Sequence, residues 1–313
     1  MNQALRSFLG LGLAAKETYS VTDKLLGILN LVPPIFLLLT PINAASAVVL
    51  SLQGFPPLEK CVLGLIAVAF AGGGVVALNS YFDRNRDRAI WPERPIPSER
   101  IKASSALIYA LSLFTGALLC SWFFFNPVNF SILLVAIILG ALYSAYLRDK
   151  VGYLSLPPIV GLIYLGGWAA FSPETLFTSP LPWYLYLLGL VWQAAHIMVY
   201  YPLHLTSGAN GKPVMKLPAF FFIPTPQLAV GLGLGFLVLT ILMSSFLPLL
   251  TPLSGLYLVL VLAAGGYALY NGSRFLRNTA SRERGLKTFA SLTIFRLAIS
   301  AAILLDIFLF HRL

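Results

Sequence analysis

Two carboxylates and an amide recur at four-residue intervals at the start of the stretch that runs from Asn79 to Lys102. Asn79, Asp83 and Asp87 occupy positions i, i+4 and i+8. On an α-helix this spacing places all three on one face, one turn apart. Their oxygen atoms are the hard ligands that Mg²⁺ prefers, and Mg²⁺ commonly shares its other positions with water and a substrate phosphate. The spacing therefore predicts a helical magnesium site made by these three residues.

Basic residues are interleaved with this stripe and follow it. Carboxylates that hold a metal, with cations around them, indicate a phosphorylated ligand rather than a bare ion. Taken alone, acids and bases just after a membrane helix can also be an ordinary solvated helix end. The two interpretations can be distinguished by whether the residues after Asp87 follow a recognisable sequence motif. The basic residues are Arg84, Arg86, Arg88, Arg94, Arg100 and Lys102.

The residues after Asp87 do follow such a pattern. The stretch reads N-x-x-x-D-x-x-x-D and then R-x-x-x-P-x-R-P-I-P-S, ending at Ser98. It resembles the first aspartate-rich motif of the UbiA-type intramembrane prenyltransferases, with Asp83, Asp87, Arg94 and Pro95 at the family's positions. The Arg-Pro-Ile-Pro-Ser tail is most similar to the chlorophyll-synthase and archaeal lipid-synthase branches. The resemblance implies an all-helical membrane fold, Mg²⁺ at the aspartates and transfer of a polyprenyl group from its diphosphate.

A second polar stretch, Y-S-A-Y-L-R-D-K at residues 143–150, closes an apolar run. The family commonly has Tyr-Ser near this point, followed by Arg and Lys. The resemblance implies that Tyr143, Arg148 and Lys150 contact the donor diphosphate. The alternative is a basic pair whose side chains snorkel to the membrane surface. Asp149 can simply pair with a neighbour.

The loop in which the family carries a second aspartate-rich motif departs from the family pattern. No Asp or Glu occurs in residues 175–282, although the K-L-P ending that begins at Lys216 fits. Lys212 and Lys216 could contact the diphosphate directly without a second metal, because an ammonium group is adequate for a phosphate. His204 and Asn210 could supply weaker ligands. The remaining alternative is that the site has decayed and the protein no longer catalyses.

The apolar run before that loop contains Trp192, Gln193 and His196 in a W-Q-x-x-H pattern. This pattern is similar to the haem-farnesylating branch of the family, although that branch keeps an acid downstream. Polar groups in a span of lipid length usually face a cavity, so Gln193 and His196 are candidate substrate-binding residues. They could equally be a hydrogen-bonded pair in the core.

Composition assigns the chain to the membrane. Of its 313 residues, 58% are apolar and 10% are charged, whereas a soluble domain has about 25% charged residues. The net charge of +10 reflects Lys and Arg collected on one side of the membrane, and no nucleic-acid partner is expected. Cys61 and Cys120 lie inside apolar runs, so no disulfide framework is expected.

Apolar runs of spanning length predict nine transmembrane helices. Every second loop is basic, so the positive-inside rule places the N-terminus in the cytoplasm and the C-terminus outside. We expect one membrane domain over residues 1–313, with 1–23 as an amphipathic interfacial segment and 24–310 as the bundle. Prolines at 33–34 and 157–158 predict kinks or local unwinding. The spans are residues 24–42, 60–82, 103–125, 128–147, 155–172, 181–203, 226–247, 253–271 and 287–310.

Two charges remain inside the last span. Arg296 and Asp306 are ten residues apart, which is about 15 Å along a helix, so they are not expected to pair. We expect Arg296 to face a polar partner in the bundle.

The sequence thus predicts a bundle whose cavity opens toward the cytoplasm and laterally to lipid, with a polyprenyl diphosphate donor and a lipophilic, aromatic or lipid acceptor. Asp83 and Asp87, helped by Asn79, would bind Mg²⁺, and Arg94 would join the basic residues of 143–150 in stabilising the leaving diphosphate. One alternative is a catalytically inactive relative that binds an isoprenoid diphosphate or partners a true synthase. A transporter ranks last, because its acids would lie at mid-membrane.

Overall fold

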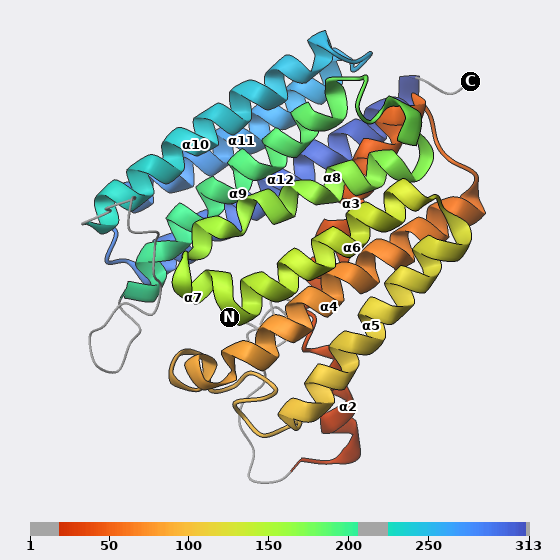
Figure 1. Cartoon of the computed structure of the whole chain (residues 1–313). Helices are drawn as coiled ribbons and strands as arrows, with labels where there is room; N and C mark the ends of the chain where they lie inside the picture. The colour runs from red at the N-terminus through yellow and green to blue at the C-terminus, as the bar shows by residue number, and fades with distance from the viewer. Residues whose placement is uncertain (1–18, 206–224, 311–313) are drawn as a thin grey trace.

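The computed structural model describes residues 19–205 and 225–310, and all regular secondary structure within these ranges is helical (Figure 1). α3 packs against α4, α8 and α12, and so joins the two halves of the bundle. The helices are α2 (Val21–Leu29), α3 (Pro34–Leu52), α4 (Leu58–Ile90), α5 (Ala103–Phe124), α6 (Pro127–Leu142), α7 (Arg148–Lys150), α8 (Pro157–Phe171), α9 (Leu181–Leu205), α10 (Pro226–Phe246), α11 (Gly255–Leu276) and α12 (Arg282–Phe310).

The first long helix begins later than predicted. The expected span of residues 24–42 lies inside the segment Val21–Leu52, but it is interrupted, because the chain forms the short α2 and then the 19-residue α3. Ser20 and Asp23 form a capping box that starts α2. The prolines at 33–34 separate the two helices, as predicted for a kink or unwound turn. The predicted amphipathic segment 1–23 lies outside the described residues, apart from its last five.

α4 is longer than a bilayer requires. Its 33 residues correspond to about 50 Å, against about 30 Å for the hydrocarbon core. The expected span 60–82 lies within α4, and the helix continues about two turns beyond it. The stripe of Asn79, Asp83 and Asp87 is carried by the last turns of this same helix, which confirms the helical spacing.

The chain leaves α6 through a π-turn. The π-helix Tyr143–Leu147 follows α6 directly and leads into α7. The Arg148 N–H donates to the Tyr143 carbonyl oxygen, a step of five residues instead of four. Such a turn adds a residue to the helix and often occurs at functional sites. Here it leaves the Arg148 side chain only 3% exposed.

The helices pack closely through small residues. A Cβ on Gly167 of α8 would come within 2.5 Å of the Ala44 carbonyl oxygen of α3. One on Gly161 would come within 2.8 Å of the Tyr186 carbonyl oxygen of α9. Backbone-to-backbone contact at small residues is typical of membrane helices. α8 is thereby fixed between its two neighbours.

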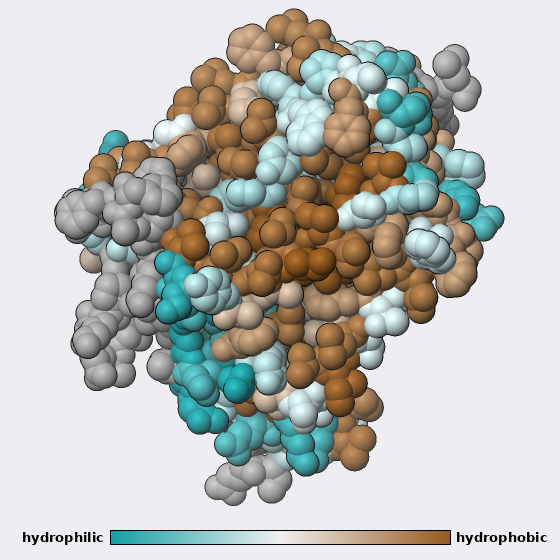
Figure 2. Space-filling view, viewed as in Figure 1, coloured by the Kyte–Doolittle hydropathy of each residue, from teal (hydrophilic) through white to brown (hydrophobic). Residues whose placement is uncertain are grey.

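The described residues contain eight helical segments long and apolar enough to cross a membrane, so the chain is a multi-pass membrane protein. One of the eight joins α2 and α3 as Val21–Leu52. α9 is outside this set, although it has 25 residues and packs against α8, α10 and α12. Figure 2 shows a broad apolar band, with hydrophilic residues gathered below it where α4 ends. Both cysteines are free.

Candidate active site

The polar end of α4 holds the predicted carboxylate stripe in a buried position. Asp83 is 8% exposed and Asp87 is 4% exposed. A carboxylate removed from water is stable only when charged or hydrogen-bonding partners surround it. The structure provides these partners as arginine side chains.

Asp83 is the most heavily paired of the acids. Its Oδ2 accepts from Arg148 Nη1 at 2.6 Å, and its Oδ1 accepts from Arg86 Nη1 at 3.2 Å. With the Asn79 amide oriented to satisfy both of its ends, its nitrogen donates to Asp83 Oδ2 at 2.7 Å and its oxygen accepts from Arg148 at 2.9 Å. The predicted residues Asn79, Asp83 and Arg148 therefore meet at one point between α4 and α7.

Asp87 has a partner in the loop that follows α4. Arg94 Nη1 donates to Asp87 Oδ2 at 2.8 Å, and its guanidinium lies over the Trp91 ring at 5.6 Å. Burial alone would lower the pKa of the Arg94 guanidinium, but Asp87, Tyr200 and Asp83 together outweigh that effect and raise it. The Arg-Pro-Ile-Pro-Ser loop thus folds back and presents its arginine to the stripe.

Two residues of this network, Arg86 and Tyr153, carried no specific prediction from the sequence, whereas Asp149 was expected to pair with a neighbour. Arg86 Nη2 bonds to Asp149 Oδ1 at 2.6 Å, and Arg86 Nη1 donates to the Tyr153 hydroxyl at 3.2 Å. Asp149 also lies 3.6 Å from Arg148 Nε. Arg86 follows Asp83 by three residues, so it was placed near the stripe but not assigned to it. Only the packing of α7 against α4 reveals the pairing.

The basic residues of the Asn79–Lys102 stretch do not all lie at the carboxylates. Arg86 and Arg94 contact the carboxylates, whereas Arg84, Arg88 and Lys102 line a separate cavity of about 500 Å³. Arg100 is buried and donates to the Glu93 carbonyl oxygen at 2.9 Å. The expectation that all six basic residues surround the metal ligands is therefore wrong for four of them.

The predicted diphosphate ligands of residues 143–150 also separate. Tyr143 is buried, and its ring lies 5.9 Å from the Arg148 guanidinium. Lys150 is exposed at the end of α7. Tyr143 and Arg148 therefore belong to the buried network, while Lys150 lies at its rim.

The donor set suits a metal that is shared with a substrate. The described residues contain no group of three His, Cys, Asp or Glu side chains able to hold a metal alone. Mg²⁺ is usually bound through one or two carboxylates together with waters and substrate phosphates. Asp83, Asp87 and the Asn79 oxygen fit that requirement.

A column of aromatic rings begins beside the carboxylate stripe. Tyr200 of α9 interacts electrostatically with Arg94 and Asp87. Ring centroids follow at 5.1 Å from Tyr200 to Phe289, 4.2 Å from Phe289 to His196 and 4.7 Å from His196 to Trp192. We call these four residues the ring column. His196, predicted from the sequence, lies inside it.

Other residues predicted on the α9 side are less informative. Gln193 is buried in α9. Lys212 and Lys216 lie outside the described residues. Tyr200 carried no prediction, although its four-residue spacing from His196 could have indicated a shared face.

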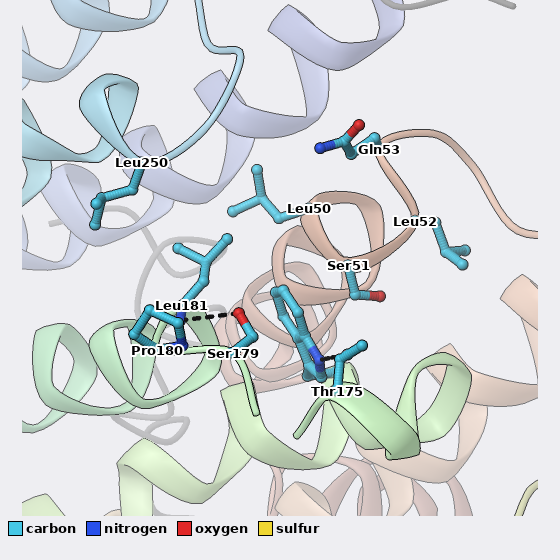
Figure 3. Close-up of a pocket in the computed structure, with 10 residues that line it drawn as sticks. Leu50, Ser51, Leu52, Gln53, Thr175, Ser179, Pro180, Leu181 and Leu250 are labelled. Atoms are coloured by element: carbon cyan, nitrogen blue, oxygen red, sulfur yellow. Dashed lines mark hydrogen bonds between the residues drawn. The ribbon is translucent and has the colours of Figure 1, made fainter. Parts of the chain in front are cut away.

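A second cavity lies at the opposite end of the bundle (Figure 3). It measures about 480 Å³ and is bordered by Ser51 and Gln53 of the α3 end, Thr175, Ser179 and Leu250. None of its lining residues is charged, so it lacks the groups that a diphosphate requires.

Comparison with known proteins gives a family assignment. The model of the UbiA prenyltransferase family matches residues 38–297, which is most of the chain. The chain belongs to this family. The matched residues include the carboxylate stripe and the ring column.

Curated relatives within the UbiA family fall into two groups. The chain is 26% identical to protoheme IX farnesyltransferase of Methylococcus capsulatus, over 84% of this chain and 88% of the relative. It is 32% identical to digeranylgeranylglyceryl phosphate synthase of Methanothrix thermoacetophila, over 44% of this chain and 55% of that relative. Farnesyl and digeranylgeranyl groups are both isoprenoid chains, so the chain resembles membrane prenyltransferases.

Solved UbiA homologues share the fold. The apo structure of a homologue from Aeropyrum pernix K1 superposes with a TM-score of 0.67 at 16% identity, covering 85% of this chain and 97% of that one. A homologue from Archaeoglobus fulgidus bound to DMAPP and Mg²⁺ gives a TM-score of 0.56 at 16% identity, covering 88% and 98%.

Proposed function

We propose that this protein transfers a polyprenyl group from a polyprenyl diphosphate to a lipophilic acceptor within the membrane. The observation that carries the proposal is the buried stripe of Asp83 and Asp87, which Arg86, Arg94 and Arg148 surround at the polar end of α4. Family membership and the names of the relatives supply the reaction class.

The arginines are the residues that would hold the diphosphate. Guanidinium groups bind phosphate oxygens through paired hydrogen bonds. Arg94 lies in the loop after α4, and Arg148 lies in α7. Because they come from different segments, together they can enclose a ligand. Tyr143 supplies a hydroxyl beside them, and Lys150 supplies charge at the rim.

Asp83 and Asp87, with Asn79, would hold Mg²⁺ against that diphosphate. The metal, when bound, screens the charge that develops on the leaving group. During transfer the C1–O bond of the donor breaks and its electron pair leaves with the diphosphate. A new bond then forms between C1 and the acceptor, which releases a proton. The preorganised arginines favour the charge distribution of that transition state.

The ring column is proposed as a wall of the pocket for the hydrophobic substrates. Aromatic faces attract cations, so rings near C1 would stabilise an allylic cation. His196 and Gln193 are the polar groups on this side and are proposed to contact substrate. The acceptor itself is aromatic or lipid in character.

We also propose a specific topology for the chain. It forms one membrane domain that crosses the bilayer nine times, with α9 as an additional crossing beside the eight apolar segments. The N-terminus and the carboxylate stripe lie on the cytoplasmic side, because Lys and Arg concentrate at that end of the helices.

The proposal is tested by incubating the purified protein with geranylgeranyl diphosphate, Mg²⁺ and an acceptor panel, and measuring diphosphate release. Asp83→Asn and Asp87→Asn should each lower turnover by at least about 100-fold, as expected for loss of a transition-state charge contact. Lys287→Gln, a charge change at an exposed ion pair of α12, serves as the control. Turnover within a few-fold of wild type in both Asp variants would refute the assignment.

The second candidate is a catalytically inactive isoprenoid-binding or partner protein, and the absence of acids in residues 175–282 is what favours it. An inactive protein should bind a prenyl diphosphate but should release no diphosphate with any acceptor. The same incubation separates the two.

A further inference from the structure

Arg296 is a buried cation that the diphosphate site does not use. It lies at the middle of α12, is 6% exposed, and its Nε and Nη2 atoms have no hydrogen-bond partner among the described residues. Its guanidinium stacks on the Trp192 indole at 4.5 Å, and Tyr164 interacts with it. The Trp192 ring is itself held by its Nε1 bond to the Leu292 carbonyl oxygen at 3.0 Å.

No carboxylate within the described ranges compensates this charge. Arg296 forms no ion pair there, and Asp306 of the same helix instead accepts from the Ser254 backbone N–H at 3.0 Å. A buried charge is strongly unfavourable in a membrane unless an opposite charge accompanies it. Contact with an aromatic ring offsets only part of that cost. Arg100 also has two unpaired donors, but it lies in the loop after α4, whereas Arg296 lies at the middle of a membrane-spanning helix. Its Nε and Nη2 atoms are therefore free to bind an anionic partner that is not part of the described chain.

Accessible surface leads from the diphosphate site toward this arginine. Residues 192–195 and 197–199 of α9 are buried, but His196 retains accessible surface, and so do Tyr200 and Phe289. Three of the four members of the ring column, Tyr200, Phe289 and His196, therefore keep accessible surface. His196 and Arg296 both contact Trp192, so the accessible part of the column ends next to the buried cation.

The length of this path decides which molecule can supply the anion. Trp192 and Tyr200 are eight residues apart on α9, which is about 12 Å. A diphosphate held by Arg94, beside Tyr200, is thus too far away to satisfy Arg296. The hydrocarbon tail of the donor is uncharged and cannot do so either. A second substrate that lies along the ring column can.

We propose that Arg296 binds a carboxylate or phosphate group of the acceptor and so selects acceptors that carry an acidic group at their end remote from the prenylated atom. This inference rests on the proposed prenyl transfer and names the chemical class of its second substrate. Arg296 would set acceptor specificity without touching the reacting atoms. A planar guanidinium with two free donors suits the paired oxygens of either acid.

The test uses the full-length protein in nanodiscs and two probe pairs that differ only in charge. The pairs are protohaem with its dimethyl ester, and geranylgeranylglyceryl phosphate with the corresponding alcohol. Dissociation constants are measured without donor or Mg²⁺ for wild type, Arg296→Gln and Arg296→Lys. Arg277→Gln, an exposed arginine after α11, is the matched control.

Wild type should bind the charged member of at least one pair about 10- to 150-fold more tightly than the neutral one, as expected for a hydrogen bond to a charged group. Arg296→Gln should abolish that ratio, Arg296→Lys should keep part of it, and Arg277→Gln should leave it unchanged. Affinity for a donor analogue should not change in any variant. If Arg296→Gln fails to fold, the inference is still tested by the ratio of affinities for charged and neutral probes in wild type and in Arg296→Lys.

Two results would overturn the inference. One is a wild-type protein that shows no preference for the charged probe in either pair. Failure to bind any of the probes counts as the same result. The other is a preference that survives in Arg296→Gln, which would make Arg296 a structural cation of the bundle. Because the assay requires no turnover, Asp83→Asn should retain the charge preference. A protein that keeps this preference but never releases diphosphate would refute prenyl transfer alone.

Discussion

At the scale of single residues, the two aspartates of the stripe differ in their surroundings. Asp83 pairs with Arg148, whose side chain is only 3% exposed, whereas Asp87 pairs with Arg94, whose side chain is 28% exposed. Removing one member of a buried pair leaves its partner uncompensated, but a half-buried partner such as Arg94 is partly rehydrated. The same chemical change should therefore have unequal structural consequences at the two positions.

Asp83→Asn should lower the free energy of unfolding by about 3 kcal/mol, and Asp87→Asn by about 1 kcal/mol or less. Thermal unfolding in detergent, followed by circular dichroism, measures the difference. Arg148→Gln in the Asp83→Asn background provides the control, because removing both charges should recover part of the lost stability. Equal losses for the two single variants would contradict this account of burial.

The lysines of the loop between α9 and α10 make a separate prediction. Lys212→Ala and Lys216→Ala should each weaken binding of a non-hydrolysable prenyl diphosphate analogue about 10- to 150-fold at fixed salt. The reason is that this loop lacks the acids that would recruit a second metal, so an ammonium group would contact the diphosphate directly. Lys287→Ala serves as the control. Unchanged affinity in both loop variants would favour a decayed second motif.

At the scale of elements, the π-turn of residues 143–147 determines the position of Arg148. Deleting the exposed Ala145 should restore an α-helical register and rotate Arg148 by about 100°. The arginine would then lose Asp83, and turnover should fall about as far as in Arg148→Gln, by roughly 100-fold or more. Ala145→Ser, which keeps the residue count, should remain active. An active deletion variant would show that the turn is incidental.

The sequence predicted the helical stripe well because a four-residue spacing is a local property of one helix. It could not predict that Arg86 pairs with Asp149, since that contact depends on how α7 packs against α4 after the π-turn. The break inside residues 24–42 has a local origin instead. Hydropathy extends one span across it, whereas the prolines at 33–34 predict the unwound turn. The ring column was missed because two of its three ring contacts involve Phe289, which lies in α12.

At the scale of the whole molecule, the topology can be tested directly. Single cysteines near residues 90, 150, 212 and 280, in a background that lacks Cys61 and Cys120, should all react with an impermeant reagent from the cytoplasmic side. The basic loops at that end of the helices are the physical reason. A cysteine at 52, at the end of α3, should react only from the opposite side. Outside labelling at 212 would remove one crossing from the count.

The ion-pair network of the site has a thermodynamic consequence for ligand binding. Asp83, Asp87 and Asp149 contribute three negative charges, and Arg86, Arg94 and Arg148 contribute three positive ones. The network is electroneutral before any ligand arrives. A diphosphate that binds alone adds uncompensated negative charge, and a magnesium ion that binds alone adds uncompensated positive charge. Each should therefore raise the affinity for the other by the same factor, because coupling between two binding equilibria is reciprocal.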